Sequence, residues 1–185
     1  MRNSRQPEHL TGKLTGNAGQ SLGAVAVNGL KIEVQGDAND YVGKGLSGGT
    51  ITVRPPMSSP LTASDNTLSG TTVLYGATGG YLYASGRAGE RFAVRNSGAS
   101  VVVEGCGSNG CEYMTGGVAV ILGSIGANFG AGMTGGMAYI YDPKGTAEDF
   151  INPESLVTCA VSHPHWEAQL KRLIEAHVAE TGSRH

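Results

Sequence analysis

The charged side chains best suited to bind a ligand lie in one short segment that contains Arg87, Glu90, Arg91 and Arg95. Arginine guanidinium groups bind carboxylates and phosphates through paired hydrogen bonds, and arginine is also enriched on surfaces that contact another protein. The spacing of four residues has no helical meaning if the segment consists of strands and turns. We therefore interpret these four residues as a candidate partner interface rather than as a ligand site.

The sequence shows no nucleophile paired with a base. Serine and threonine are abundant, but turns require them, and a catalytic nucleophile needs a neighbouring group that accepts its proton. The five histidines are His9, His163, His165, His177 and His185, and all of them lie outside the repeats described below. We expect no catalytic residue and no cofactor-binding residue in this chain.

The cysteines give no sign of a disulfide or a zinc site. Cys106, Cys111 and Cys159 are odd in number and form no CxxC pair. Cys159 with His163 and His165 would supply three ligands, whereas a structural zinc ion takes four, and no fourth ligand is nearby. We expect reduced, structural thiols, with Cys106 and Cys111 in a corner between two repeats, and no bound metal.

One glycine string imitates a nucleotide-binding loop. Gly43, Gly45 and Gly48 spell GxGxxG, which in a dinucleotide site opens a helix, but residues 50–53 have the pattern of a strand. The same spelling returns over residues 130–135, again before a strand. A motif that recurs in this way without a helix belongs to a repeat architecture, in which the glycines shape corners.

A second string, Asp37, Asn39 and Asp40, loosely resembles a calcium loop. The glutamate that closes such a loop at its twelfth position is absent, because residue 48 is glycine. These side chains are expected to accept backbone hydrogen bonds in a polar corner.

The elements that position all these residues are repeats of about 19 residues. The repeat glycines are Gly29, Gly48, Gly79, Gly98, Gly116 and Gly135, separated by 19, 31, 19, 18 and 19 residues. Removing residues 55–66, a Pro/Ser/Thr-rich run read as a surface loop, restores the long interval to 19. Three and five residues after each glycine the side chain is apolar, which is the alternation of a short strand. The sequence therefore predicts an all-β fold, a right-handed parallel β-helix of about six or seven coils.

Glycine is the outlier in composition, with 30 residues against the roughly 13 that an average protein of this size contains. The excess is expected at corners, where the chain bends or adopts positive φ. If Gly135 needs positive φ, a valine there should unfold the protein.

The repeat ends near residue 143, and a helical period begins near Pro164. Trp166, Leu170, Leu173, Ile174 and Val178 fall on one helical face. Ser162 is the expected N-cap and Gly182 the expected stop. The predicted organisation is a flexible N-terminus over residues 1–9, a β-helix over 10–145, and a connector with a capping helix over 146–185 in the same domain.

The charge and hydropathy exclude several classes of partner. The net charge is only −2, which leaves no basic footprint for nucleic acid or an anionic membrane. No apolar run approaches the roughly 18 residues of a membrane helix, and the first residues lack a signal-peptide core. We expect a cytoplasmic protein.

Long strings of this sequence resemble the C-terminal domain of the glutamate synthase large subunit, the GXGXG domain. They are GDANDYVGKGLSGG (36–49), LYGATGG (74–80), GRAGERFAVRNSGA (86–99), GCEYMTGG (110–117), NFGAGMTGGMAYIYD (128–142) and LKRLIEAHVAETGS (170–183). The resemblance implies a β-helix without catalytic residues of its own. It also implies a class II glutamine amidotransferase and a synthase unit carrying FMN and an iron–sulfur cluster as partners, between which the β-helix positions the catalytic centres and frames the ammonia route.

The chain lacks the other parts of that large subunit. It opens Met1-Arg2-Asn3 without the amidotransferase's N-terminal cysteine, and it has no cysteine cluster for iron–sulfur binding. It is therefore read as a stand-alone or excised GXGXG unit, and self-association stays open. The alternatives are a scaffold subunit of N-methylglutamate synthase, the β-helix subunit of formylmethanofuran dehydrogenase, and an independent β-helix binding module, which predicts an exposed aromatic row on one ladder.

Overall fold

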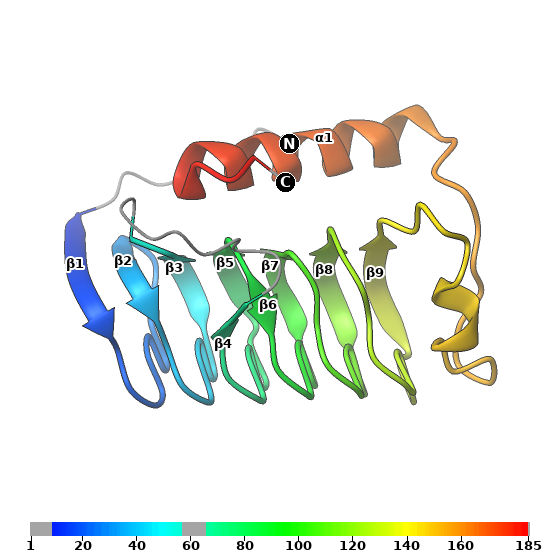
Figure 1. Cartoon of the computed structure of the whole chain (residues 1–185), viewed down its shortest axis with the longest axis horizontal. Coiled ribbons are helices and arrows are strands. Elements are labelled where there is room, and N and C mark those ends of the chain that lie inside the picture. The colour runs from blue at the N-terminus through cyan, green and yellow to red at the C-terminus, as the bar shows by residue number, and fades with distance from the viewer. Residues whose placement is uncertain (1–8, 57–65, 185) are drawn as a thin grey trace.

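The computed structural model, described here for residues 9–56 and 66–184, is a parallel β-solenoid with one C-terminal helix. Figure 1 shows the strands side by side along the length of the solenoid, with the helix lying across them. The main sheet has seven parallel strands, in the order β1 (Leu10–Asn17), β2 (Leu30–Asp37), β3 (Ser47–Arg54), β5 (Gly79–Ala84), β7 (Ser97–Val103), β8 (Thr115–Ile121) and β9 (Gly135–Ile140). The predicted fold class is confirmed.

The register between the strands reproduces the spacing of the repeat glycines. Ile32 pairs with Ile51, Ile51 with Leu82 and Leu82 with Val101, and the ladder continues through Ala119 to Ala138. These side chains point inward and stack into one continuous core. The predicted alternation of apolar residues is therefore the ladder that fills the solenoid.

The long interval between the second and third repeat glycines contains β4 (Thr67–Ser69), which forms a second, two-stranded sheet with a strand of the next coil. That strand is β6 (Arg87–Ala88), which pairs with β4 in parallel on another side of the coils. Most of the run predicted as a surface loop, residues 57–65, lies outside the described residues. So does the predicted flexible N-terminus except for His9, whose amide donates to the Gly29 carbonyl.

The turns that close each coil alternate residues with positive φ and residues without it. The residues with positive φ are Tyr41, Gly43 and Gly45 in one turn, and Arg91, Ala93 and Arg95 in a later one. The amides in these turns bond to neighbouring coils; the Ala93 amide, for example, lies 2.8 Å from the Val73 carbonyl oxygen. The GxGxxG string is thus a solenoid turn, and hydrogen bonds between coils hold even non-glycine residues in the left-handed region.

The repeat glycines are required for a different reason from the one we expected. In four of the six repeats positive φ falls on the following glycine, as at Gly136 with φ 86°, and Gly135 itself does not have positive φ. Gly29, with φ 88°, is the one repeat glycine with positive φ. A Cβ atom on Gly135 would lie 2.4 Å from the Thr115 carbonyl oxygen of the preceding coil. The expectation of positive φ at Gly135 was therefore wrong, and close approach of two backbones excludes a side chain there.

The C-terminal helix α1 (Pro164–Thr181) follows the single-turn 3-10 helix η2 (Ala147–Asp149). Its N-cap is His163, whose side chain accepts a hydrogen bond from the His165 amide, and not the expected Ser162. Gly182 ends the helix with φ 72°, as expected. No helix among residues 9–56 and 66–184 is long and apolar enough to cross a membrane.

The helix packs against outward-facing side chains of the sheet. Tyr83, Val102, Val120 and Tyr139 stack on successive strands and are buried together with Leu173 of α1. Two of the residues predicted for the buried helical face, Trp166 and Val178, are instead partly exposed. The outer face of the sheet is therefore a second, smaller core, which the helix completes.

We predict that Gly135→Ala destabilises the protein, because its new methyl group would overlap the Thr115 carbonyl. Overpacking of this kind typically costs about 1–3 kcal/mol. Gly12→Ala is the matched control, since its Cβ would meet nothing closer than 4.0 Å. Thermal unfolding followed by circular dichroism should show a lower Tm for the first variant only, and equal Tm values would contradict the close-approach assignment.

Candidate functional site

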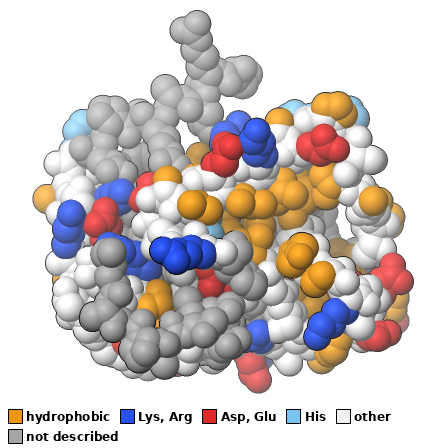
Figure 2. Space-filling view, turned by 45° about the horizontal axis from the view of Figure 1, so that its top comes forward, with side chains coloured by type: hydrophobic (Ala, Val, Ile, Leu, Met, Phe, Trp, Pro, Cys, Tyr) orange, Lys and Arg blue, Asp and Glu red, His pale blue; other side chains and the backbone are white. Residues whose placement is uncertain are grey.

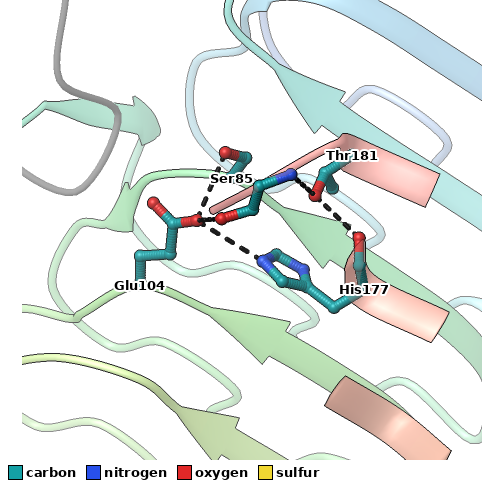
Figure 3. Close-up of polar contacts among 5 residues, drawn as sticks. Ser85, Glu104, His177 and Thr181 are labelled. Carbon is teal, nitrogen blue, oxygen red and sulfur yellow. Dashed lines mark hydrogen bonds and ion pairs between the residues drawn. The ribbon is translucent and has the colours of Figure 1, made fainter. Parts of the chain in front are cut away.

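The most unusual polar feature is a buried pair of ionisable side chains, Glu104 and His177 (Figure 3). Glu104 directly follows β7, and His177 lies in α1, 73 residues later. Both side chains have 0% exposure, and the Glu104 Oε1 atom lies 3.5 Å from the His177 Nε2 atom. Burying two such groups is unfavourable unless they are paired, so the contact fixes where the helix sits on the solenoid.

Hydroxyl groups complete this network. The Ser85 hydroxyl donates to Glu104 Oε1 over 3.2 Å, and the Ser183 hydroxyl donates to the same oxygen. The Thr181 hydroxyl donates to the His177 carbonyl, and the Ser183 amide donates to the Thr181 hydroxyl oxygen. One carboxylate oxygen therefore joins two neighbouring coils to the last turn of α1.

The environment of Glu104 favours its ionised form. Burial by itself would raise the pKa of Glu104, but hydrogen bonds from His177, Ser183 and Ser85, with the charge of His177, hold that pKa below its ordinary value. The other carboxylate oxygen, Oε2, and His177 Nδ1 have no hydrogen-bond partner among the described residues. Removing either side chain would leave the other buried and unpaired.

The geometry suits anchoring and not catalysis. No solvent reaches either side chain, and the Tyr83 ring packs 6.3 Å from the His177 ring. A base that acts on a substrate must come within hydrogen-bond reach of it. Sequence reasoning missed the pair because its members are so far apart in the chain. The available signal was that His177 lies on the same helical face as Leu170, Leu173 and Ile174.

The structure separates the four residues of the candidate partner interface. Arg87 is half-buried and bonds internally, to the Ser124 hydroxyl and to the Cys106 carbonyl oxygen. Glu90, Arg91 and Arg95 are exposed on one turn of the solenoid. Arg87 is therefore occupied within the fold, and the other three residues remain candidates for contact with a partner.

Exposed tyrosines lie on the corresponding turns of other coils. Tyr41, Tyr75 and Tyr113 are 37–52% exposed, on three different coils. The Lys44 amine lies 5.5 Å from the centre of the Tyr41 ring, and the Arg95 guanidinium 5.9 Å from that of Tyr113. The tyrosines occupy different positions within their turns, so they form a scattered surface and not the regular aromatic row that a sugar-binding ladder would need.

Two of the three cysteines are buried structural thiols. All three are unpaired, with Cys106 and Cys111 buried and Cys159 exposed. Burial raises the pKa of Cys106 to about 12 and that of Cys111 well above its ordinary value, so both stay protonated and serve as small apolar side chains. No group of three or more His, Cys, Asp and Glu side chains that could hold a metal ion occurs in the part of the chain that the structure describes.

The string that resembles a calcium loop is a polar corner. Asp40 accepts a hydrogen bond from the Thr71 amide over 2.8 Å, and the Asn39 side chain accepts one from the Asn17 side chain. These bonds join the corner to both neighbouring coils. The predicted acceptance of a backbone hydrogen bond is thus confirmed for Asp40, whereas Asn39 accepts from a side chain.

The stacked parallel coils, with a helix anchored across them by a buried charged pair, define a parallel β-solenoid protein. Comparison with known proteins gives the particular family: residues 2–185 match the model of the GXGXG motif, and the chain belongs to that family. The resemblance seen in the sequence is confirmed.

The relatives are glutamate synthases of much greater length. The chain is 68% identical over 179 residues to the glutamate synthase [NADPH] large chain of Azospirillum brasilense, covering 97% of this chain and 12% of that protein. It is 53% identical over 175 residues to ferredoxin-dependent glutamate synthase 2 of Synechocystis, covering 95% and 11%. It is 52% identical over 169 residues to glutamate synthase [NADH] of Schizosaccharomyces pombe, covering 91% and 8%. The chain thus spans about a tenth of the length of these relatives.

We predict that Glu104→Ala loosens the helix, because His177 is left buried without its partner. Breaking a buried pair in this way typically costs about 3–5 kcal/mol. Glu175→Ala is the matched control, since Glu175 is exposed and pairs with Lys171 on the same helix. Trypsin should cleave the first variant after Lys171 or Arg172 much faster than the control, and equal cleavage rates would refute an anchoring role.

The lowered pKa of Glu104 also predicts a pH dependence. A carboxyl group with a depressed folded-state pKa stabilises the fold above its unfolded-state pKa, and the stabilisation is lost as the pH falls through the folded-state value. The natural chain should therefore have a higher Tm than Glu104→Gln, and the difference should be largest at neutral pH. It should shrink as the pH drops below the ordinary value of 4.5. A difference that stays constant down to strongly acidic pH would contradict the assigned ionised state.

Proposed function

We propose that this chain is the non-catalytic scaffold of a glutamate synthase-type complex. The observation that carries the proposal is its 68% identity, over 97% of its length, to part of a glutamate synthase large chain. In the proposed complex a class II glutamine amidotransferase releases ammonia, and a synthase unit with FMN and an iron–sulfur cluster consumes it. Those cofactors belong to the partner units, and a cytoplasmic location is part of the same proposal.

The scaffold role rests on rigidity. Each coil is bonded to its neighbours along its strands and its turns, for example from the Cys111 amide to the Phe92 carbonyl over 2.6 Å and from the Arg95 amide to the Glu112 carbonyl over 2.9 Å. A platform of this kind changes shape little when partners bind. Holding two remote centres in register matters for coupled reactions, because a misplacement of about 1 Å can slow a reaction on the order of 100-fold.

The partner-facing surface in this proposal is the turn that carries Arg91 and Arg95. Both residues have positive φ, with values of 56° and 54°, and their amides bond to the next coil. The backbone of these two residues is therefore held in one conformation, so the Cα–Cβ bonds that carry the two side chains have defined positions. Arginine and tyrosine together are typical of the residues that carry binding energy at protein interfaces.

We predict that the tagged chain, isolated from its native cell extract, retains an amidotransferase and a coloured flavin and iron–sulfur chain. Mass spectrometry identifies the bound proteins, and an absorbance spectrum of the eluate reports the cofactors. A molybdenum- or tungsten-containing partner would transfer the chain to a formylmethanofuran dehydrogenase-type complex. A colourless eluate without partners would favour the independent binding module.

A charge-reversed variant gives this experiment its control. Arg91→Glu combined with Arg95→Glu should reduce recovery of the partner chains while leaving Tm within a few degrees. Arg172→Glu, on the exposed side of α1, is the matched single reversal and should leave recovery unchanged. Equal recovery for both variants would show that this turn is not part of the proposed interface, but it would not contradict the proposed complex.

A further inference from the structure

The C-terminal end of the solenoid carries an open strand edge. β9 is the last strand of the main sheet, and no strand among residues 9–56 and 66–184 pairs with its outer side. The Tyr141 amide donates inward, to the Ile121 carbonyl of β8. Because successive residues of a strand direct their amide and carbonyl groups to alternate sides, Ala138 and Ile140 present theirs to the open edge. This edge can therefore bond to another extended backbone.

A groove of about 620 Å³ runs along this edge. One wall is β9 itself, the floor includes Phe129, Met133 and Ile151, and the far wall is residues 156–161. Met133, Ala138 and Ile140 pack on the main core but are only partly buried. The groove thus exposes the unfinished end of the apolar core next to unpaired backbone groups.

After β9 the chain begins a further coil beside this groove without adding a strand to the main sheet. Phe129 and Ile151 form a parallel bridge, and the Gly132 amide donates to the Ser155 hydroxyl. After Ser155 the chain continues toward α1 along the far wall of the groove, where Val157 is 97% exposed. Figure 1 shows this connector standing off from β9. The position of an eighth strand of the main sheet therefore lies between β9 and the connector.

Charge indicates what kind of segment would fit. Between residues 142 and 161 the chain has four carboxylates, Asp142, Glu148, Asp149 and Glu154, and a single cation, Lys144. Asp142 and Glu148 line the groove itself. Figure 2 shows hydrophobic side chains gathered over the right-hand half of the molecule, with acidic side chains at its right-hand edge. An apolar groove with an acidic rim complements an extended segment flanked by basic residues.

We propose that this groove binds an extended segment of a partner polypeptide as the eighth strand of the main sheet. The segment alternates apolar residues, which cover the end of the core, with polar ones, and carries lysine or arginine where it passes Asp142 and Glu148. Backbone hydrogen bonds to Ala138 and Ile140 supply affinity, and the alternate side chains supply specificity, as in other strand additions. This inference goes beyond the proposed function and does not depend on it.

The test uses two dye-labelled peptides that alternate valine and threonine, one ending in lysines and the other in glutamates. The lysine peptide should bind the full chain, seen as a rise in fluorescence anisotropy, and the glutamate peptide several-fold more weakly. Hydrogen exchange should slow by at least about tenfold at the amides of Ala138 and Ile140 when the lysine peptide is present. No binding, or protection elsewhere on the chain, would overturn the proposal.

Two pairs of variants distinguish the groove from a general effect on folding. Ala138→Pro removes an outward-facing amide, but it also enlarges a side chain of the inward ladder, so its Tm is measured with its binding, which should be abolished. Ala138→Ser keeps the amide and should bind. Should the proline variant fail to fold, Glu148→Lys should weaken binding of the lysine peptide, and Glu175→Lys on α1 should not.

Two other occupants of the edge would each refute the proposal. Slow exchange at Ala138 and Ile140 in the free chain, independent of its concentration, would show that residues 157–161 close the edge themselves. Protection that grows with protein concentration would show that a second copy fills it. Neither result bears on the co-purification experiment, and a partner-free eluate there leaves the peptide result unchanged.

Discussion

Backbone-to-backbone contact between stacked coils is the constraint on which the rest of this structure depends. Coils joined by parallel strand pairing stand about 4.8 Å apart, so each coil meets the next along the strands and through the turns. Where the start of a strand faces a carbonyl group of the preceding coil, as at Gly98 of β7 beside Thr78, no side chain fits. Where the amides point between coils, even arginine and tyrosine residues are held at positive φ. Glycine spacing, turn conformation and strand register are three consequences of one stacking distance.

Stacking of the coils buries the apolar side chains of the interior. It does not cover the outer face of the sheet or the two ends of the solenoid. The outer face is apolar at Tyr83, Val102, Val120 and Tyr139, and α1 covers it. Apolar packing alone fixes the position of a helix weakly, because it is not directional. The Glu104–His177 contact, with the ion pair of 2.8 Å between Lys31 and Glu180 near the end of the helix, adds direction. The buried pair is thus best understood as a device that specifies where the helix lies.

These properties suit a part of a larger assembly. The chain corresponds to about a tenth of its glutamate synthase relatives, and its described surface combines fixed turns bearing arginines and tyrosines with the open strand edge of β9. A rigid body with distinct contact regions is what a scaffold requires. The two regions differ in chemistry, since the turn with Arg91 and Arg95 carries cations whereas the groove beside β9 is rimmed by carboxylates, so they favour different partner segments.

Local sequence determined the parts of this protein that repeat or that depend on neighbours in the chain. The interval between glycines set the strand register, the alternation after each glycine set the inward ladder, and the helical period after Pro164 located α1. Tertiary structure decided what depends on atoms far apart in sequence. It assigned Gly135 to a clash with Thr115 in place of positive φ, drew Arg87 into internal hydrogen bonds with Ser124, and brought Glu104 to His177. Register is a local property, because each coil has nearly the same length. Contacts between a coil and the helix depend on how that helix is placed across the whole sheet, and no short-range pattern encodes that placement.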